Sequence, residues 1–206
     1  MHQEILEKNT GKNLELLGRS KMLDSWYLAG GTGLALAFGH RMSIDLDFFS
    51  SKKGSNENMV RELKQLGNFE VETLEEKTLH GIFNGTKMSC IYYPYKMLRN
   101  TNEFHGIHIA DPIDIACMKI SAISSRGTKK DFVDLYYLLQ KWSLAEIVAY
   151  FEEKYEEIGY NIIHILKSLS YFADADEDPN PIFIEKSHPS WNIIKRTLQR
   201  EVKKLL

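Results

Sequence analysis

The sequence contains only two cysteines, Cys90 and Cys117, and they are too far apart to form a CxxC pair. This spacing argues against cysteine-based zinc motifs, and no N-terminal run has the order of a secretory signal. No apolar run reaches the roughly 18 to 20 residues that a membrane helix needs. We therefore expect a reduced, cytoplasmic protein that does not enter a membrane.

A large charge of either sign is also absent. The 206 residues include 26 basic and 28 acidic side chains, which gives a formal net charge of -2. Such a chain has no global attraction to nucleic acid, so any contact with a polyanion must come from a local patch. With 43% hydrophobic residues, no repeats and no low-complexity linker, the chain can bury a substantial core.

The periodicity of the apolar residues predicts an α+β fold. A helical pattern over residues 10–24 precedes WYLAGG, which is typical of a strand that ends in a tight turn. A short helix should follow over 32–39, and the alternating SIDLDFF should form a strand. Residues 69–93 have the pattern of β-structure, with Asn84-Gly85 as a hairpin turn.

After Asp111-Pro112 the pattern is almost wholly helical. We therefore predict an N-terminal lobe of residues 1–110 with a mixed β-sheet, followed by a helical C-terminal lobe of residues 111–206. The helices expected in this second lobe span residues 112–125, 129–141, 143–157, 160–172 and 188–205.

Two neighbouring motifs carry the candidate chemistry. The turn Gly30-Gly31-Thr32 lies between a strand and a helix, where unpaired backbone N–H groups and the helix dipole favour an anion such as a phosphate. Asp45 and Asp47 stand two residues apart in an expected strand, so both side chains leave on one face, with Cα atoms roughly 6 to 7 Å apart. Paired carboxylates of this kind can hold the divalent cations of a phosphoryl-transfer site.

Each motif alone has an ordinary structural explanation. A glycine pair often forms only a turn, and two aspartates often line an exposed edge strand. Their combination favours function, because it supplies a phosphate seat and metal ligands together.

The segment YLAGGTGLALAFGHRMSIDLDFFS resembles the first two motifs of the AbiEii/AbiGii toxin family, nucleotidyltransferase-like proteins of abortive-infection toxin-antitoxin systems. Downstream, MKISAISSRGTKKDFVDLYYLL resembles the lysine-bearing and aspartate-bearing third and fourth motifs, and YFADADEDPNP is similar to another family segment. The resemblance thus spans nearly the whole chain. It implies a nucleotidyltransferase-like N-terminal lobe.

The resemblance also implies roles for the residues of the first two motifs. Gly30, Gly31 and Thr32 would hold nucleotide phosphates, and Asp45 and Asp47 would bind magnesium. Thr32 stands where serine is common in the wider superfamily, and the hydroxyl is kept.

Three cations belong to the same predicted site. By resemblance Lys119 would neutralise phosphate charge, with Arg126 and Arg41 as further nucleotide-binding cations. Each has a structural alternative. An isolated lysine beside an apolar helix stripe usually extends its ammonium to water, Arg126 suits a helix end through the dipole, and Arg41 is equally consistent with the surface.

The role of Asp131 stays open in the sequence. Thr128-x-x-Asp131 is typical of a helix start with an acid in its first turn. Resemblance to the fourth motif instead makes Asp131 a catalytic or lysine-orienting acid, with Asp134, one turn later, as the substitute.

One expected feature is missing. Many nucleotidyltransferases carry a third carboxylate on a later strand, but the candidate strand MSCIYY has none. Glu70 and Glu72 are candidate substitutes. The absence puts general-base catalysis in doubt and leaves positioning and metal electrostatics as the main contributions.

These observations predict a magnesium-dependent enzyme that transfers a nucleotidyl group from a nucleoside triphosphate to an acceptor. By resemblance, it is a growth-arresting toxin opposed by an antitoxin protein, and a transfer RNA end is a candidate acceptor. Two alternatives stay open: a catalytically weak module that holds a nucleotide or RNA, and a phosphotransferase that moves the γ-phosphate.

Overall fold

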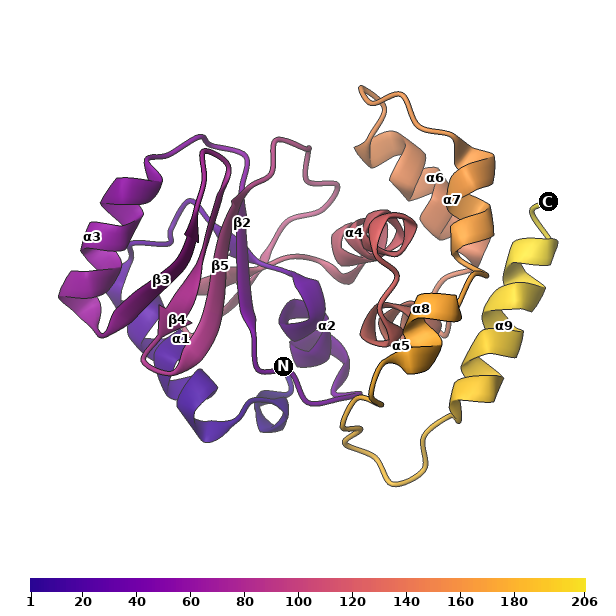
Figure 1. Ribbon diagram of the computed structural model, residues 1–206, viewed down its shortest axis with the longest axis horizontal. Helices are drawn as coiled ribbons and strands as arrows, with labels where there is room; N and C mark the ends of the chain where they lie inside the picture. The colour runs from indigo at the N-terminus through magenta and orange to yellow at the C-terminus, as the bar shows by residue number, and fades with distance from the viewer.

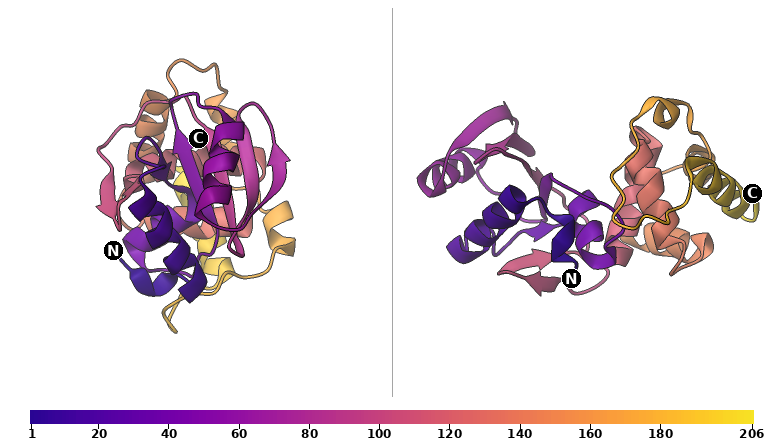
Figure 2. Two further views of the ribbon diagram at one scale, coloured as in Figure 1. Left: turned by 90° about the vertical axis from the view of Figure 1, so that its left-hand side faces the viewer. Right: turned by 90° about the horizontal axis from the view of Figure 1, so that it is seen from below.

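The computed structural model describes all 206 residues and has two halves (Figure 1). A β-sheet with its helices forms one half, a group of helices forms the other, and the C-terminus lies at the far end of the helical half. Seen from below, the same two groups of elements lie side by side (Figure 2). No helix is both long and apolar enough to cross a membrane.

The sheet half contains four helical segments and seven strands. The helical segments are the 3-10 turn η1 (Gln3–Ile5), α1 (Lys8–Ser20), α2 (Gly30–Phe38) and α3 (Asn56–Leu66). The strands are β1 (Tyr27–Leu28), β2 (Leu46–Ser50), β3 (Phe69–Leu74), β4 (Thr78–Phe83), β5 (Thr86–Tyr92), β6 (Asn102–Phe104) and β7 (Ile107–Ile109).

The remaining elements are all helices. They are α4 (Pro112–Ser125), α5 (Lys129–Leu138), α6 (Leu144–Lys154), α7 (Ile162–Ser168), α8 (Ala173–Glu177) and α9 (Trp191–Lys203). The predicted α+β class and the mixed sheet are thus confirmed.

The seven strands form one sheet in the order β3-β4-β5-β2-β1-β7-β6. β2 runs parallel to β5 and β1 runs parallel to β7, whereas the other neighbours are antiparallel. The predicted hairpin at Asn84-Gly85 joins β4 to β5, and both residues have the positive φ, 45° and 81°, that a two-residue turn of this kind requires. The arrangement places β2, with Asp47 on it and Asp45 just before it, in the middle of the sheet.

Alternation along β2 sends its side chains to two different cores. Leu46 and Phe48 point to a hydrophobic cluster whose residues all lie between Ile5 and Ile109, including those of α1 and α3. Phe49 belongs to a second cluster, which continues through α2 and α4 into the helical half. Asp47 shares the face of Phe49, so it faces the helical half.

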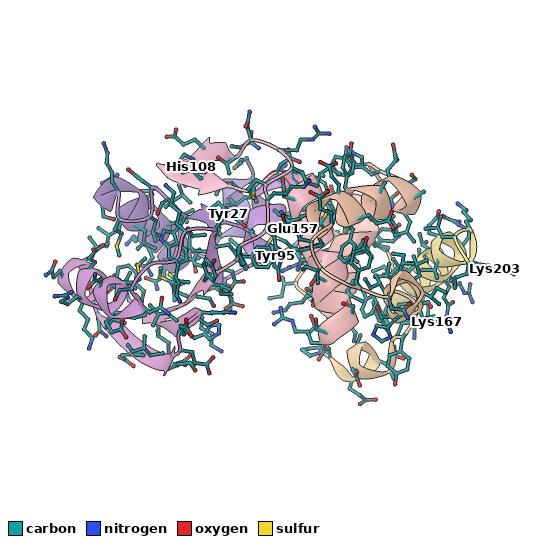
Figure 3. All side chains as sticks on the ribbon, turned by 90° about the horizontal axis from the view of Figure 1, so that it is seen from above. Tyr27, Tyr95, His108, Glu157, Lys167 and Lys203 are labelled. Atoms are coloured by element: carbon teal, nitrogen blue, oxygen red, sulfur yellow. The ribbon has the colours of Figure 1, made fainter.

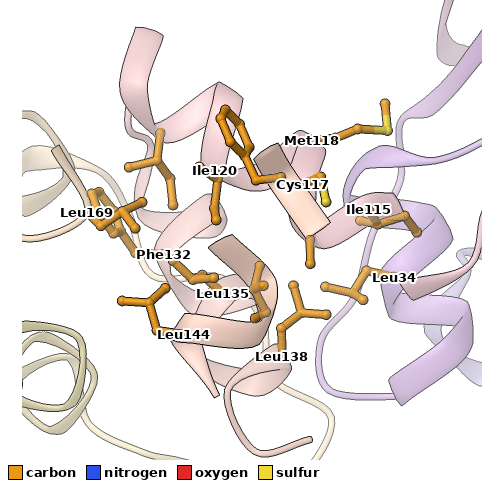
Figure 4. Close-up of a cluster of buried hydrophobic side chains, with 14 of the residues drawn as sticks. Leu34, Ile115, Cys117, Met118, Ile120, Phe132, Leu135, Leu138, Leu144 and Leu169 are labelled. Atoms are coloured by element: carbon orange, nitrogen blue, oxygen red, sulfur yellow. The ribbon is translucent and has the colours of Figure 1, made fainter. Parts of the chain in front are cut away.

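Helix α4 connects the two halves. In Figure 4, Leu34 of α2 lies beside Ile115 of α4, and the cluster continues to Phe132 and Leu135 of α5. Because this core includes Leu34 and Phe49 from the first half, it crosses residue 110. The division of the chain near that residue stays a prediction.

Aromatic and charged groups reinforce the junction. Figure 3 shows Tyr27 and Tyr95 between the sheet and the helical half, and the Tyr95 ring packs edge-on against Tyr155 of the helical half at 5.0 Å. Asp114 and Lys154, both fully buried, form an ion pair of 2.6 Å between α4 and α6. Both helices belong to the helical half, and the pair reaches the first half because Asp114 accepts from the Leu98 N–H at 3.0 Å and Lys154 donates to the Lys96 carbonyl at 2.6 Å. Breaking one partner of a buried ion pair is strongly destabilising.

Several predicted boundaries were wrong. The first helix ends at Ser20 rather than at residue 24, because Lys21 adopts a left-handed conformation with φ of 59°. The helix expected from residue 32 already begins at Gly30, and β2 begins only at Leu46, so Asp45 immediately precedes the strand. The hairpin of β6 and β7 and the short helix α8 were not predicted.

Candidate active site

The site begins at the glycine turn between β1 and α2. Gly30 has φ of +61°, and a Cβ there would lie 3.0 Å from Asp47 Oδ2. A Cβ on Gly31 would lie 2.3 Å from the guanidinium of Arg41. Both positions therefore need glycine. Gly30, Gly31 and Thr32 are the first residues of α2, so their backbone N–H groups have no partner carbonyl within the helix and are available to an anion.

The hydroxyl of Thr32 faces the interior. It lies 2.9 Å from Ser43 Oγ and also donates to the carbonyl of Asp45, in a side chain that is almost completely buried. Thr32 therefore holds the segment that leads to the two aspartates. Its backbone N–H, rather than its hydroxyl, is the group that could meet a phosphate.

The carboxylates of Asp45 and Asp47 carry no ion pair, although several cations lie nearby. Burial raises the pKa of Asp47, and the charge of Asp45 raises it further, against the effect of a hydrogen bond from Ser89 and the charge of Lys119. The repulsion between two close carboxylates is what a divalent cation would relieve.

The donor set suits magnesium rather than a cation held by protein ligands alone. No cluster of three or more His, Cys, Asp or Glu residues is arranged to hold a metal. Magnesium usually takes one or two carboxylates and completes its shell with water and substrate phosphates. Asp45 and Asp47 fit that pattern because they lie beside the glycine turn that can bind a phosphate. They would supply the protein's two ligands to the metal.

Lys119 is buried in an ion-pair network, which corrects the view that its ammonium extends to water. Its Nζ lies 2.8 Å from Asp131 and 2.6 Å from Asp134. Burial alone would lower the pKa of Lys119, but the charges of Asp134 and Asp131 raise it above its ordinary value. The lysine is therefore fully charged, and it lines the cleft beside Asp45 and Asp47.

Asp134 is the centre of this network. It accepts hydrogen bonds from Arg41 Nε at 2.7 Å and Arg41 Nη2 at 2.9 Å, and it lies 2.7 Å from His40 Nε2. Burial would raise its pKa, but Arg41 and Lys119 hold that pKa well below the usual range. Arg41 is only 2% exposed, so the surface alternative is wrong. The guanidinium of Arg41 is bound to Asp134. The predicted contact of Arg41 with a nucleotide stays a prediction.

Asp131 contacts the lysine. Its Oδ1 accepts from Lys119 Nζ at 2.8 Å and its Oδ2 accepts from the Thr128 hydroxyl at 2.7 Å. The carboxylate that caps the start of α5 comes from elsewhere, since Asp178 accepts from the Lys129 N–H at 2.8 Å. Of the two sequence alternatives, the geometry favours a lysine-orienting acid.

Arg126 ends α4 on the side of the cleft. Its side chain is 72% exposed, and its Nε lies 3.9 Å from Asp131 Oδ2. The pair is too long and too open to engage the guanidinium fully, so Arg126 can turn toward a bound anion.

A cleft with two openings surrounds these groups. The larger opening, about 530 Å³, lies between the sheet and α4 and reaches Phe49 and Tyr93. The smaller, about 320 Å³, passes Thr128 and Lys130 to a segment that we call the strap, residues 178–184. Both openings are lined by Gly31, Asp45, Asp47, Lys119, Arg126 and Asp131.

The strap pairs with the segment that carries His40 and Arg41. The Met42 N–H donates to the Ile182 carbonyl at 2.8 Å, and the Ile184 N–H donates to the His40 carbonyl at 3.3 Å. Together with the Asp178 cap on α5, these bonds hold the Arg41–Asp134 contact from both sides.

Several residues of the site were missed in the sequence. His40 belongs to a loop that has no periodic pattern, and Ser43 begins the predicted strand segment SIDLDFF, where its contact with Thr32 leaves no local signal. His80 and Ser89 line the larger opening, and the cross-strand pairing that brings them there is not visible in either segment alone. Of the two candidate substitutes for the third carboxylate, Glu72 lines the opening, and a β-bulge between Val71 and Thr73 reorients it.

Comparison with known proteins finds a similar sequence and similar structures. A protein of Aquifex aeolicus is 37% identical over 207 residues, covering 98% of each chain. A candidate nucleotidyltransferase of H. pylori has a similar structure, with a TM-score of 0.52 at 15% identity over 99% of this chain and 94% of the other. MenT4, a nucleotidyltransferase toxin of Mycobacterium tuberculosis, is similar with a TM-score of 0.45 at 13% identity, over 98% and 85%.

The family model described as nucleotidyl transferase AbiEii toxin, type IV toxin-antitoxin system, matches residues 14–101 and 93–204. These two matches span both motif regions and the cleft between them. The chain therefore belongs to the AbiEii family of nucleotidyltransferase toxins.

Proposed function

We propose that this nucleotidyltransferase uses magnesium to transfer a nucleotidyl group from a nucleoside triphosphate to the 3′ end of a transfer RNA. The observation that carries the proposal is a pair of carboxylates without ion pairs, Asp45 and Asp47, directly opposite an open glycine turn and beside the charged Lys119. Asp45 and Asp47 would hold the magnesium, which would supply positive charge against the triphosphate.

The cations and N–H groups of the cleft bind and orient the triphosphate. The N–H groups of Gly30 and Gly31 donate hydrogen bonds to phosphate oxygens. Lys119 neutralises phosphate charge, and Arg126 adds a second cation from the exposed end of α4. Asp131 keeps Lys119 in place. The acceptor oxygen bonds to the α-phosphorus as the bond to the pyrophosphate oxygen breaks, and the hydroxyl proton passes to solvent.

The two openings suit two substrates. The larger has an apolar end at Phe49 and Tyr93, which suits a nucleobase and sugar. The smaller is mostly polar and carries Arg126, Thr128 and Lys130, which suits a sugar-phosphate chain. An antitoxin protein that restrains this activity is part of the proposal and follows from membership of a toxin-antitoxin family.

The decisive experiment incubates the purified protein with each α-labelled triphosphate, magnesium and total cellular RNA. We expect label in RNA of transfer RNA size, release of pyrophosphate, and loss of both when magnesium is chelated. Nucleotide binding without pyrophosphate release would instead support a weak binding module. Release of a labelled diphosphate would identify a phosphotransferase, and label in protein would identify a protein acceptor.

A further inference from the structure

A row of three side chains crosses the sheet at the cleft. Asp47 on β2 is paired with Ser89 on β5, and Ser89 is paired with His80 on β4. Directly paired residues project to the same face, so the three side chains lie side by side. His80 Nδ1 is 2.9 Å from Ser89 Oγ, and Ser89 is near enough to the Asp47 carboxylate to lower its pKa.

The number of protons on each group determines which side chain in this row donates a hydrogen bond and which accepts it. A serine hydroxyl has one proton to donate, whereas an ionised carboxylate can only accept. If Ser89 donates to Asp47, its oxygen must accept from His80, so the proton of the imidazole sits on Nδ1. His80 Nε2 then remains free to face the larger opening, which both His80 and Ser89 line.

The position of Ser89 adds to the argument. It occupies the place on β5 directly opposite Asp47, on the strand whose sequence offers no carboxylate. The carboxylate of Asp47 also packs against Gly30, where even a Cβ would be 3.0 Å from Oδ2. Asp47 is thus confined by backbone on one side and by a hydrogen-bond donor on the other.

We propose that His80 is a positioning residue that acts through Ser89 to fix the Asp47 carboxylate in the orientation in which it meets a divalent cation. The inference rests on the proposed function, because it takes Asp47 as a metal ligand. In this site β5 contributes the neutral hydroxyl of Ser89 and no third carboxylate. Groups that orient a metal ligand from behind typically change metal affinity by about 10- to 100-fold when removed.

Two isosteric substitutions test the row. In His80→Asn the amide nitrogen can occupy the place of Nδ1 and still donate to Ser89, whereas in His80→Gln the amide lies further out, near the place of Nε2. We expect His80→Gln and Ser89→Ala each to weaken Mn²⁺ binding about tenfold, measured by electron paramagnetic resonance with a non-hydrolysable triphosphate. His80→Asn should stay near wild type. Thr73→Ala, which changes the other cross-strand neighbour of His80, should have no effect.

A double variant provides the sharper criterion. If His80 acts through Ser89, then His80→Gln should cause no further loss in the Ser89→Ala background. Additive losses, or wild-type Mn²⁺ affinity in His80→Gln, would overturn the proposal. ¹⁵N NMR should show His80 protonated on Nδ1 in the wild type and released from that tautomer in Ser89→Ala, and an unchanged spectrum would also overturn it.

The Asp47→Asn variant distinguishes a failure of the His80 positioning role from a failure of the proposed metal pair. Loss of Mn²⁺ binding in Asp47→Asn, with His80→Gln unaffected, overturns the positioning role and leaves the metal pair standing. Retained Mn²⁺ binding in Asp47→Asn overturns the metal pair and the positioning role together.

Discussion

Two pairs of carboxylates at the cleft have the same chemistry and opposite surroundings, although Asp134 of one pair is fully buried behind the cleft surface. On α5, Asp131 and Asp134 are buried against Lys119, and their pKa values are lowered. At the start of β2, Asp45 and Asp47 have no cationic partner, and the pKa of Asp47 is raised. The negative charge of the α5 pair is balanced by Lys119 and Arg41 inside the protein. The charge of Asp45 and Asp47 has no such partner, so it is available to a ligand.

The largest expected effect comes from the β2 pair. Replacing Asp47 by Asn should reduce nucleotidyl transfer by at least ~10³-fold, since a lost metal ligand removes several kcal/mol of transition-state stabilisation. Stability should be unchanged or improved, because no ion pair is broken and a partly buried charge is removed. Turnover and thermal unfolding of Asp45→Asn and Asp47→Asn test this. Undiminished transfer in both variants would remove the metal role from the comparison.

The α5 pair should show the reverse pattern. Asp134→Ala leaves Arg41 and Lys119 without their shared partner, and we expect the free energy of unfolding to fall by about 3 to 5 kcal/mol. Asp176→Ala is the matched control, since it breaks the partly exposed pair with Lys195 and should destabilise the protein far less. Urea denaturation measures both. A similar loss in the two variants would show that burial of the α5 network matters less than its geometry suggests.

Asp131 lies between these extremes. Asp131→Asn still accepts a hydrogen bond from Thr128, so we expect a folded protein whose transfer rate falls by about 10²-fold, because the ionic contact with Lys119 is lost. Asp131→Ala should in addition lose stability. Rates measured well below the melting temperature distinguish the two effects. A normal rate in Asp131→Asn would move the orienting role to Asp134, which the same assay on Asp134→Asn would decide.

The smallest effect should be the dependence of stability on pH in the absence of divalent cations. The lowered pKa values of Asp131 and Asp134 stabilise the fold above the pKa of an unfolded aspartate, near 3.8, and this contribution is lost as the pH falls through the folded values. The raised pKa of Asp47 has the opposite sign, because its folded form binds the proton more tightly. Acidification through that pKa, above 3.8, should therefore stabilise the protein.

Denaturant unfolding between pH 6 and pH 3 measures both signs. Asp47→Asn should remove the gain above 3.8, and Asp134→Asn should reduce the loss below it. Identical profiles for wild type and Asp47→Asn would contradict the raised pKa.

The sequence predicted the parts of the site that lie in continuous motifs. The glycine turn, the aspartates of β2 and the hairpin at Asn84-Gly85 depend on local conformation, which neighbouring residues determine. The contact of Arg41 with Asp134 joins residues 93 positions apart, and local patterns carry no information about it. From the sequence, Arg41 was therefore equally consistent with a nucleotide-binding cation and with a surface residue, although it is one of the most buried cations in the protein.

Two further differences have physical causes. Strands β6 and β7 are three residues each, too short for an alternating pattern, and they depend on pairing with β1 through β7. In the sequence, Asp131 has the spacing of a helix-start residue. The carboxylate that caps α5 is instead that of Asp178, which belongs to the strap. Sequence reasoning finds an acid in the first turn of a helix but cannot know that a distant carboxylate already caps it.

The strap also has a consequence for the order of events during synthesis. The His40–Met42 segment forms hydrogen bonds with Ile182 and Ile184, and Asp178 caps the start of α5. On a growing chain, the glycine turn, the aspartates and Lys119 all emerge well before these partners exist. The cleft can therefore reach its final form only when the last eighth of the polypeptide is being made, so a nascent toxin lacks a complete site for most of its translation.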